Sequence, residues 1–223
     1  ANAGTANIGI YNKSGSIENS GNIKIGDSVI IDSQNLYENQ YAVGIYGENV
    51  QDMKNRSNIK VGSNAVGIYV TNNVNESLNT GNITSSSEKA IGIYSGSGSV
   101  RNEGNITLSG SGSMGIAAER SSTVTNAGII TMNGDNSAGI YANVNSKVIN
   151  ESTGKIYING NDSVGVQLSG GSILENYGVI TIASGTINST DVIKGKDGYT
   201  APSIINAGVI KVDEKFELDG YNL

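Results

Sequence analysis

The 223 residues of this sequence include no histidine and no cysteine, so the candidates considered for acid–base catalysis are its carboxylates. This composition excludes Ser-His-Asp and Cys-His nucleophiles and metal sites built from histidine or cysteine. Asp135 and Asp162 occupy equivalent turns of a repeat, and Glu88 lies in the same turn two copies earlier. A polysaccharide lyase or glycosidase needs clustered carboxylates, or an aspartate with lysine or arginine, in a groove. One carboxylate per turn is more typical of solvated surface, so we expect no enzyme activity, metal or cofactor.

Tyrosine recurs two residues after the glycine in most copies of a Gly-Ile-Tyr pattern. The glycine removes one neighbouring side chain, so we expect the rings to lie along an open shelf. Tyrosine supplies amphipathic contact area at low entropic cost, and the column therefore predicts a contact surface for a glycan or a protein. The alternative is a stacked ladder that only stabilises adjacent copies. The candidate binding residues of this column are Tyr46, Tyr69, Tyr94 and Tyr141.

Two insertions interrupt the repeat, one at residues 27–41 and one at residues 185–201. Insertions in repeat proteins emerge as loops and often carry binding residues. An excursion at the surface without a function is the alternative for each. From the first insertion we take Leu36, Tyr37 and Tyr41 as further candidate binding residues.

An asparagine column precedes a turn in every copy of the repeat. We expect these side chains to point inward and to hydrogen-bond both the turn backbone and the asparagine of the next copy, which satisfies polar groups that a corner would otherwise bury unpaired. A ligand site is the alternative interpretation. The column contains Asn19, Asn55, Asn79, Asn102, Asn126, Asn150, Asn176 and Asn206.

A repeat of about 24 residues must position all these side chains. Apolar residues flank each glycine, as Val66 and Ile68 flank Gly67. The period of two in a β-strand predicts that both flanks face the core and that the glycine and the tyrosine face outward. Further along the repeat, alternating residues such as Ile106 and Leu108 predict another inward face. Each copy is thus expected to form three strands of about three to five residues, separated by Gly, Ser and Asn turns.

Three such short strands cannot pair within one copy, but each can pair in parallel with its counterpart in the next copy, about 4.8 Å away. We therefore predict an all-β fold, a right-handed parallel β-helix (solenoid) of about eight coils with three short strands each. The unbroken repetition predicts a single domain over residues 1–223, shaped as a rod. With 31 glycines, one phenylalanine and no tryptophan, its core must be narrow and aliphatic.

The formal net charge of −6 comes from 20 acidic and 14 basic residues scattered singly. This pattern contains no basic patch, so we do not expect a nucleic acid partner. No apolar run approaches the ~20 residues of a membrane span, so we expect no membrane-spanning segment. The sequence opens on Ala1 without a signal peptide, which suggests a piece of a longer protein. Unpaired strand edges at both ends predict end-to-end self-association unless residues 213–223 cover one of them.

The repeat resembles the passenger regions of large type V autotransporters from fusobacteria and related Gram-negative bacteria. Units such as Asn102-Glu-Gly-Asn-Ile-Thr-Leu108 alternating with Ser137-Ala-Gly-Ile-Tyr141 carry the resemblance, which covers nearly the whole chain. It implies a β-helical passenger fragment exported through an outer-membrane β-barrel by the type V pathway and displayed at the cell surface. The vacuolating toxin family has similar repeats.

This resemblance implies an adhesin or adhesin stalk, with host-cell or bacterial surface proteins or glycans as partners. The alternatives from other classes are a β-helical polysaccharide lyase or glycosidase, a toxin-like passenger, and a passive spacer. The resemblance transfers no binding residue to this sequence.

Overall fold

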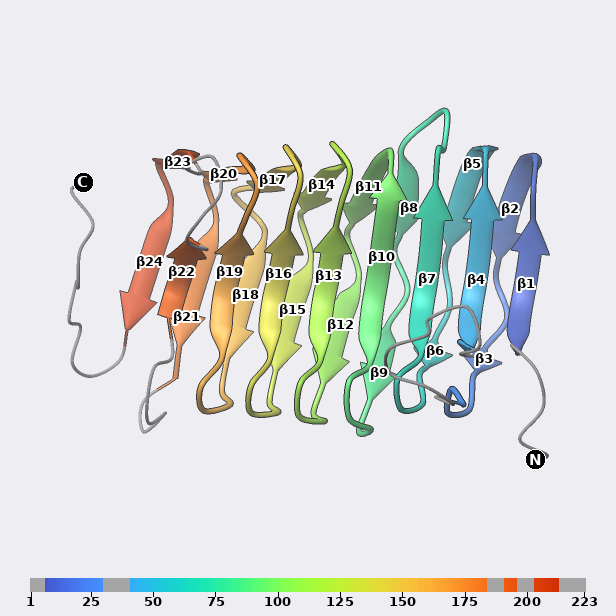
Figure 1. Cartoon of the computed structure of the whole chain (residues 1–223), viewed down its shortest axis with the longest axis horizontal. Coiled ribbons are helices and arrows are strands. Elements are labelled where there is room, and N and C mark those ends of the chain that lie inside the picture. Colours follow the sequence, from blue (N-terminus) through green and yellow to red (C-terminus); the bar gives the residue numbers. More distant parts are fainter. Residues whose placement is uncertain (1–6, 30–40, 184–190, 196–202, 213–223) are drawn as a thin grey trace.

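The chain forms a stack of β-strand coils along one axis, from an N-terminal coil at one end to a C-terminal coil at the other (Figure 1). The computed structural model describes residues 7–29, 41–183, 191–195 and 203–212. Across these ranges the strands are joined by turns, and no helix has the length and apolar character to cross a membrane.

Three parallel sheets, each with eight strands in the described ranges, run along the stack. Sheet A contains β1 (Ile8–Asn12), β4 (Val43–Glu48), β7 (Val66–Thr71), β10 (Ile91–Ser97), β13 (Met114–Ala118), β16 (Ala138–Ala142), β19 (Val164–Leu168) and β22 (Asp191–Gly195). Sheet B contains β2 (Gly15–Asn19), β5 (Val50–Asn55), β8 (Ser77–Asn79), β11 (Ser99–Asn102), β14 (Thr123–Asn126), β17 (Lys147–Asn150), β20 (Ile173–Asn176) and β23 (Ser203–Asn206). Sheet C contains β3 (Ile23–Lys24), β6 (Ile59–Lys60), β9 (Ile83–Ser85), β12 (Asn105–Leu108), β15 (Ile129–Met132), β18 (Lys155–Ile158), β21 (Val179–Ile182) and β24 (Val209–Val212).

Each strand pairs in parallel with the strand at the same position of the neighbouring coil. Ile93, for example, lies in register with Ile68 on one side and Ile116 on the other. The chain advances from sheet A to sheet B to sheet C and then begins the next coil. The predicted all-β parallel β-helix with three short strands per coil is therefore confirmed.

The core is a continuous aliphatic column enclosed by the three sheets. Ile68, Ile93, Ile106 and Ile130 have no solvent exposure, and they belong to one buried cluster that runs through successive coils. Burial of one such side chain contributes about 1.5–3 kcal/mol. Because each coil covers the apolar side chains of its neighbours, the coils stabilise one another cooperatively.

The Gly-Ile-Tyr strands depart from the predicted alternation at the glycine. A Cβ at Gly92 would lie 2.8 Å from Cγ2 of Ile106, so this position faces the core and not the solvent. The following residue, Ile93, is also fully buried, whereas the preceding Ile91 is only half-buried and lies on the outer side. The residues on both sides of Gly92 pair with their counterparts in the neighbouring strands, but Gly92 itself does not. This irregularity permits two consecutive residues, Gly92 and Ile93, to face inward. The prediction was therefore wrong for the glycine and for the flank before it, whereas the predicted inward position of the flank after it, such as Ile68 or Ile93, is confirmed.

The asparagine column forms the predicted ladder at the corner between sheets B and C. Nδ2 of Asn79 donates to Oδ1 of Asn102 at 2.8 Å, and Nδ2 of Asn102 donates to Oδ1 of Asn126 at 3.0 Å. The same amide of Asn102 also donates to the carbonyl of Gly104 in the turn, at 3.1 Å. Side-chain bonds of this kind connect all eight members. Both predicted sets of hydrogen bonds are confirmed, and they account for these amides without a ligand.

Candidate binding surfaces

The tyrosines form a ring ladder on the outer face of sheet A. Parallel pairing places Tyr46 beside Tyr69 and Tyr69 beside Tyr94. The ring centroids of each pair lie 4.8 Å apart, and the planes are tilted by 55° and 31°. Tyr11 continues the ladder at 5.1 Å from Tyr46. The rings cover much of one another's faces, so their edges and hydroxyl groups form most of the surface that remains for a partner.

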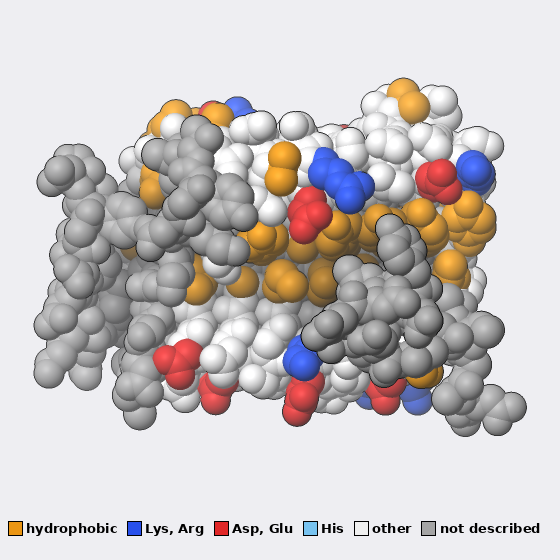
Figure 2. Space-filling model, viewed as in Figure 1, with side chains coloured by type: hydrophobic (Ala, Val, Ile, Leu, Met, Phe, Trp, Pro, Cys, Tyr) orange, Lys and Arg blue, Asp and Glu red, His pale blue; other side chains and the backbone are white. Residues whose placement is uncertain are grey.

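A second apolar row runs beside the ladder because of the irregular geometry at the glycines. Val66, Ile91 and Met114 precede successive glycines and are half-buried on the outer side of sheet A. Figure 2 shows two rows of hydrophobic side chains crossing this face of the molecule. We call the tyrosine row and this aliphatic row together the sheet A face. Its two rows make an extended apolar surface with polar groups at its borders, which is typical of interaction sites.

Carboxylates at the border of the sheet A face accept hydrogen bonds from two of its tyrosines. The Tyr94 hydroxyl donates to Oε2 of Glu119 at 2.8 Å, and the Tyr11 hydroxyl donates to Oε2 of Glu48 at 3.1 Å. Burial raises the pKa of Tyr94 above its ordinary value, and the bond to Glu119 raises it further. Burial also raises the pKa of Tyr69. These phenols therefore stay neutral at physiological pH and act as hydrogen-bonding groups, not as charges.

The ladder is interrupted in its second half. Ala117 stands at the tyrosine position of β13, between Tyr94 and Tyr141. Gln167 follows Tyr141 in β19. Sheet A thus brings Tyr46, Tyr69 and Tyr94 into a continuous row of ring contacts but separates Tyr141 from Tyr94 by one strand. The recurrence of tyrosine two residues after the glycine was predictable from the sequence, whereas the contacts between the rings depend on the register between coils.

The insertions fall largely outside the described residues, and so do the candidates Leu36 and Tyr37. Tyr41 is described: it lies just before β4 and its exposed fraction is 39%. Tyr46 of the ring ladder follows it in β4. Tyr41 is therefore an exposed aromatic residue at the start of the sheet A face.

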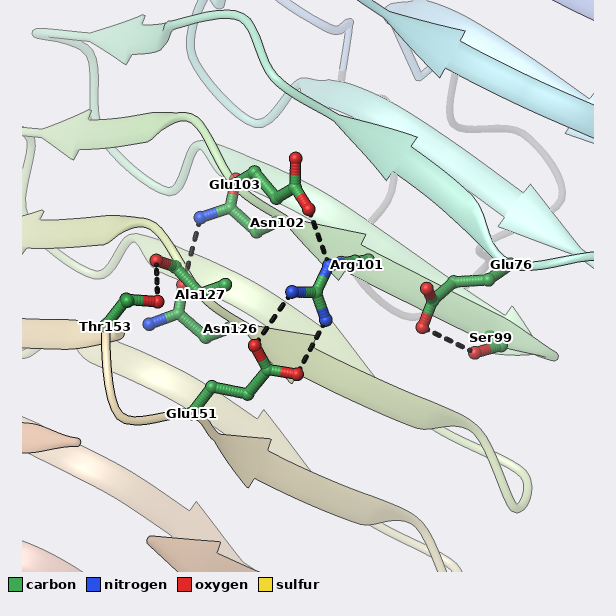
Figure 3. A network of polar contacts seen from close by, with 9 residues as sticks. All are labelled: Glu76, Ser99, Arg101, Asn102, Glu103, Asn126, Ala127, Glu151 and Thr153. Atoms are coloured by element: carbon green, nitrogen blue, oxygen red, sulfur yellow. Dashed lines mark hydrogen bonds and ion pairs between the residues drawn. The ribbon is translucent and has the colours of Figure 1, made fainter. Parts of the chain in front are cut away.

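The outer face of sheet B carries charges that are paired with one another. The two Nη atoms of Arg101 each donate to a carboxylate oxygen of Glu151 at 2.7 Å, and Nε donates to Glu103 at 2.7 Å (Figure 3). Glu151 follows β17, so this contact spans β14, which lies between β11 and β17. The hydrogen bonds to Arg101 lower the pKa of Glu151. Arg56 pairs with Glu18, and Lys147 with Glu175, elsewhere on the face. The basic groups of these pairs are therefore engaged within the chain.

The outer face of sheet C has a different chemistry that sequence reasoning missed. Nδ2 of Asn82 donates to Oδ1 of Asn58 at 2.9 Å, and Nδ2 of Asn105 donates to Oδ1 of Asn82 at 3.0 Å. This second, exposed asparagine ladder borders an open hollow of about 450 Å³. Its signal is an asparagine directly before the first isoleucine of the third strand in successive copies. The hollow is lined by Asn58, Asn82, Thr84, Asn105, Thr107 and Ile129.

The carboxylates considered for acid–base chemistry lie in turns. Oδ1 of Asp135 accepts the backbone N–H of Asn161 at 2.7 Å, and Asp162 has a positive φ of 52°. Within the described ranges, neither aspartate forms an ion pair with a basic residue. The same part of the chain has no cluster of three or more acidic residues that could hold a metal ion. The turn geometry assigns Asp135 a role in joining adjacent coils.

Comparisons with protein-family models, with curated proteins and with solved structures each found no match to this chain.

Proposed function

We propose that this chain is part of the passenger region of a type V autotransporter and acts at the bacterial cell surface as an adhesin or adhesin stalk. The observation that carries the proposal is the sheet A face, where an aromatic and an aliphatic row run side by side over successive coils. Tyrosine-rich apolar surfaces with polar borders are suited to binding proteins and glycans. The parallel β-helix and the style of its repeat also support the proposal.

The same proposal covers export and assembly. A rod that stands on the outer membrane would hold the sheet A face away from the cell, where a host-cell or bacterial receptor can reach it. At the ends of the described stack, β1 to β3 and β22 to β24 each have a strand partner on one side only. Such edges favour end-to-end association of the isolated chain. Sedimentation of a strict monomer at high concentration would contradict this association.

The binding test compares the intact chain with a Tyr69→Ala/Tyr94→Ala double variant on host cells, bacterial partner cells and a glycan array. We expect roughly a fivefold or larger loss of binding, because buried aromatic anchors dominate most interfaces. Tyr177→Ala is the matched control, since Tyr177 is 44% exposed but lies outside the sheet A face. The melting temperature of each variant separates binding from stability.

Two outcomes would contradict a binding role for the sheet A face. If the double variant binds as well as the intact chain but melts at a lower temperature, the tyrosines only stabilise adjacent coils. If the intact chain binds no partner, the stretch is a spacer. A chain lacking residues 27–41, assayed in parallel, assigns binding to that insertion if its removal abolishes binding while the tyrosine variant retains it.

A further inference from the structure

Sheet C bears only positive charges although the chain as a whole is acidic. Its strands contain Lys24, Lys60, Lys155 and Lys211 and no aspartate or glutamate, in a protein with a formal net charge of −6. The acidic residues of the described ranges lie on sheet B, at the end of β4, at the start of β22 or in turns. The outer face of sheet C is therefore locally basic, and it is complementary to an anionic partner.

The lysines of this face also differ in their surroundings from Arg101 and Lys147 of sheet B, which are paired with glutamates. Lys24, Lys60 and Lys155 are exposed, and within the described ranges none of them forms an ion pair. Arg101, by contrast, is held by two glutamates. Unpaired ammonium groups keep their full capacity to bind an external anion.

Between the lysines lies the uncharged hollow bordered by the exposed asparagine ladder. Within that ladder, the side-chain amide of Asn82 donates one hydrogen bond and accepts one. An amide has two N–H donors and two oxygen lone pairs, so one donor and one lone pair remain. Among the hydrogen bonds of the described residues, none engages the hydroxyl of Thr84 or Thr107. These spare amide and hydroxyl groups match the alternating donors and acceptors of sugar hydroxyls.

The arrangement defines the shape of the partner. β6, with Lys60, and β18, with Lys155, are separated by β9, β12 and β15. At about 4.8 Å per strand, the two lysine positions lie roughly 19 Å apart along the stack, with the hollow between them. A nucleic acid carries phosphate charges at much closer intervals, so the uncharged centre does not suit it. A sugar chain with hydroxyls throughout and acidic groups at intervals fits both parts.

We propose that the outer face of sheet C binds an acidic polysaccharide, laid along the stack with its hydroxyls on the asparagine ladder and its anionic groups on the lysines. This site is independent of the sheet A face, and binding there would persist if the tyrosines had no binding role. Conversely, failure of the acidic polysaccharide to bind would leave adhesion by the sheet A face untouched.

The test measures the dissociation constants of the whole chain for polygalacturonate, heparin, neutral dextran and single-stranded DNA at low and physiological salt. We expect saturable binding of an acidic polysaccharide that weakens with salt, and no saturable binding of dextran. Preference for polygalacturonate or for heparin distinguishes carboxylate from sulfate as the recognised group. Lys60→Gln/Lys155→Gln should raise the dissociation constant roughly tenfold. Lys54→Gln on sheet B is the control for the loss of one positive charge, to be compared with Lys60→Gln and Lys155→Gln singly, and it should leave the dissociation constant unchanged.

The asparagine ladder is tested separately with Asn82→Ala, which should raise the dissociation constant roughly threefold without changing the salt dependence. Four outcomes would overturn the proposal. They are dextran binding as tight as that of the acidic chains, tighter binding of DNA, an equal effect of Lys54→Gln, and no binding of either acidic polysaccharide.

Discussion

Two asparagine ladders of the same spacing lie near the corner between sheets B and C, one facing the core and one facing the solvent, and they differ in what their amides contact. In the inner ladder, Asn102 is fully buried, bonds to the asparagines of both neighbouring coils and also donates to the Gly104 carbonyl. In the outer ladder, Asn82 is exposed, and among the described residues its side-chain amide bonds only to the side chains of Asn58 and Asn105. One residue type thus serves two purposes. The inner amides complete a buried corner, whereas the outer amides keep donors and acceptors for solvent or a ligand.

The difference teaches that a repeated residue type is not by itself evidence of a structural or a binding role. A buried amide without its partners would lose hydrogen bonds that water cannot replace. An exposed amide regains them from solvent. Whether a column faces the core or the solvent therefore decides whether it maintains the fold or remains free to evolve toward a ligand.

The largest expected effect comes from removing one amide of each ladder. Asn102→Ala leaves the donor of Asn79 and the acceptor of Asn126 without their buried partner, so we expect it to lower the free energy of unfolding by about 3 kcal/mol. Asn82→Ala should lower it by less than about 0.5 kcal/mol, because its neighbours gain water. Urea unfolding monitored by circular dichroism measures both. Equal losses would remove the distinction between the two ladders.

Replacement of a glycine that faces the core by alanine should lower the free energy of unfolding by less than Asn102→Ala does, but by more than the same replacement of a glycine that faces the solvent. Gly92→Ala adds a methyl group against Cγ2 of Ile106 and the carbonyl of Gly115, and should cost about 2 kcal/mol through overpacking. Gly21→Ala is the control, since a Cβ there would meet no atom within 4 Å. The same urea unfolding experiment compares them. Unchanged stability of Gly92→Ala would show that the glycine column does not face the core.

Much of the fold could be predicted because the repeat shows the same alternation many times. The three strands per coil, the parallel stacking and the inner asparagine ladder all follow from columns that recur in each copy. The inward glycine could not be predicted, because the rule of alternation fails where two consecutive residues, such as Gly92 and Ile93, face the core. Absence of a Cβ permits this geometry, but the spacing of residue types does not reveal it.

The candidate surfaces were predictable only in part. The tyrosine column was visible from its distance to the glycines, whereas the aliphatic row beside it was assigned to the core. Contacts between coils that are not adjacent, such as Arg101 with Glu151, require the register of three strands at once. Lys24, Lys60 and Lys211 recur at one outward position of the third strand, so part of the basic character of sheet C could be predicted from spacing, whereas the place of Lys155 requires the register between coils.

The central claim is that the chain is a parallel β-helix with a closed inner side and an open outer side. Hydrogen exchange of asparagine side-chain amides, followed by NMR in D2O, tests it most directly. The account predicts that the amide protons of Asn79, Asn102 and Asn126 exchange slowly, whereas those of Asn82 and Asn105 exchange as fast as in an unfolded peptide. Equally fast exchange at all five positions would contradict the buried ladder and the fold built around it.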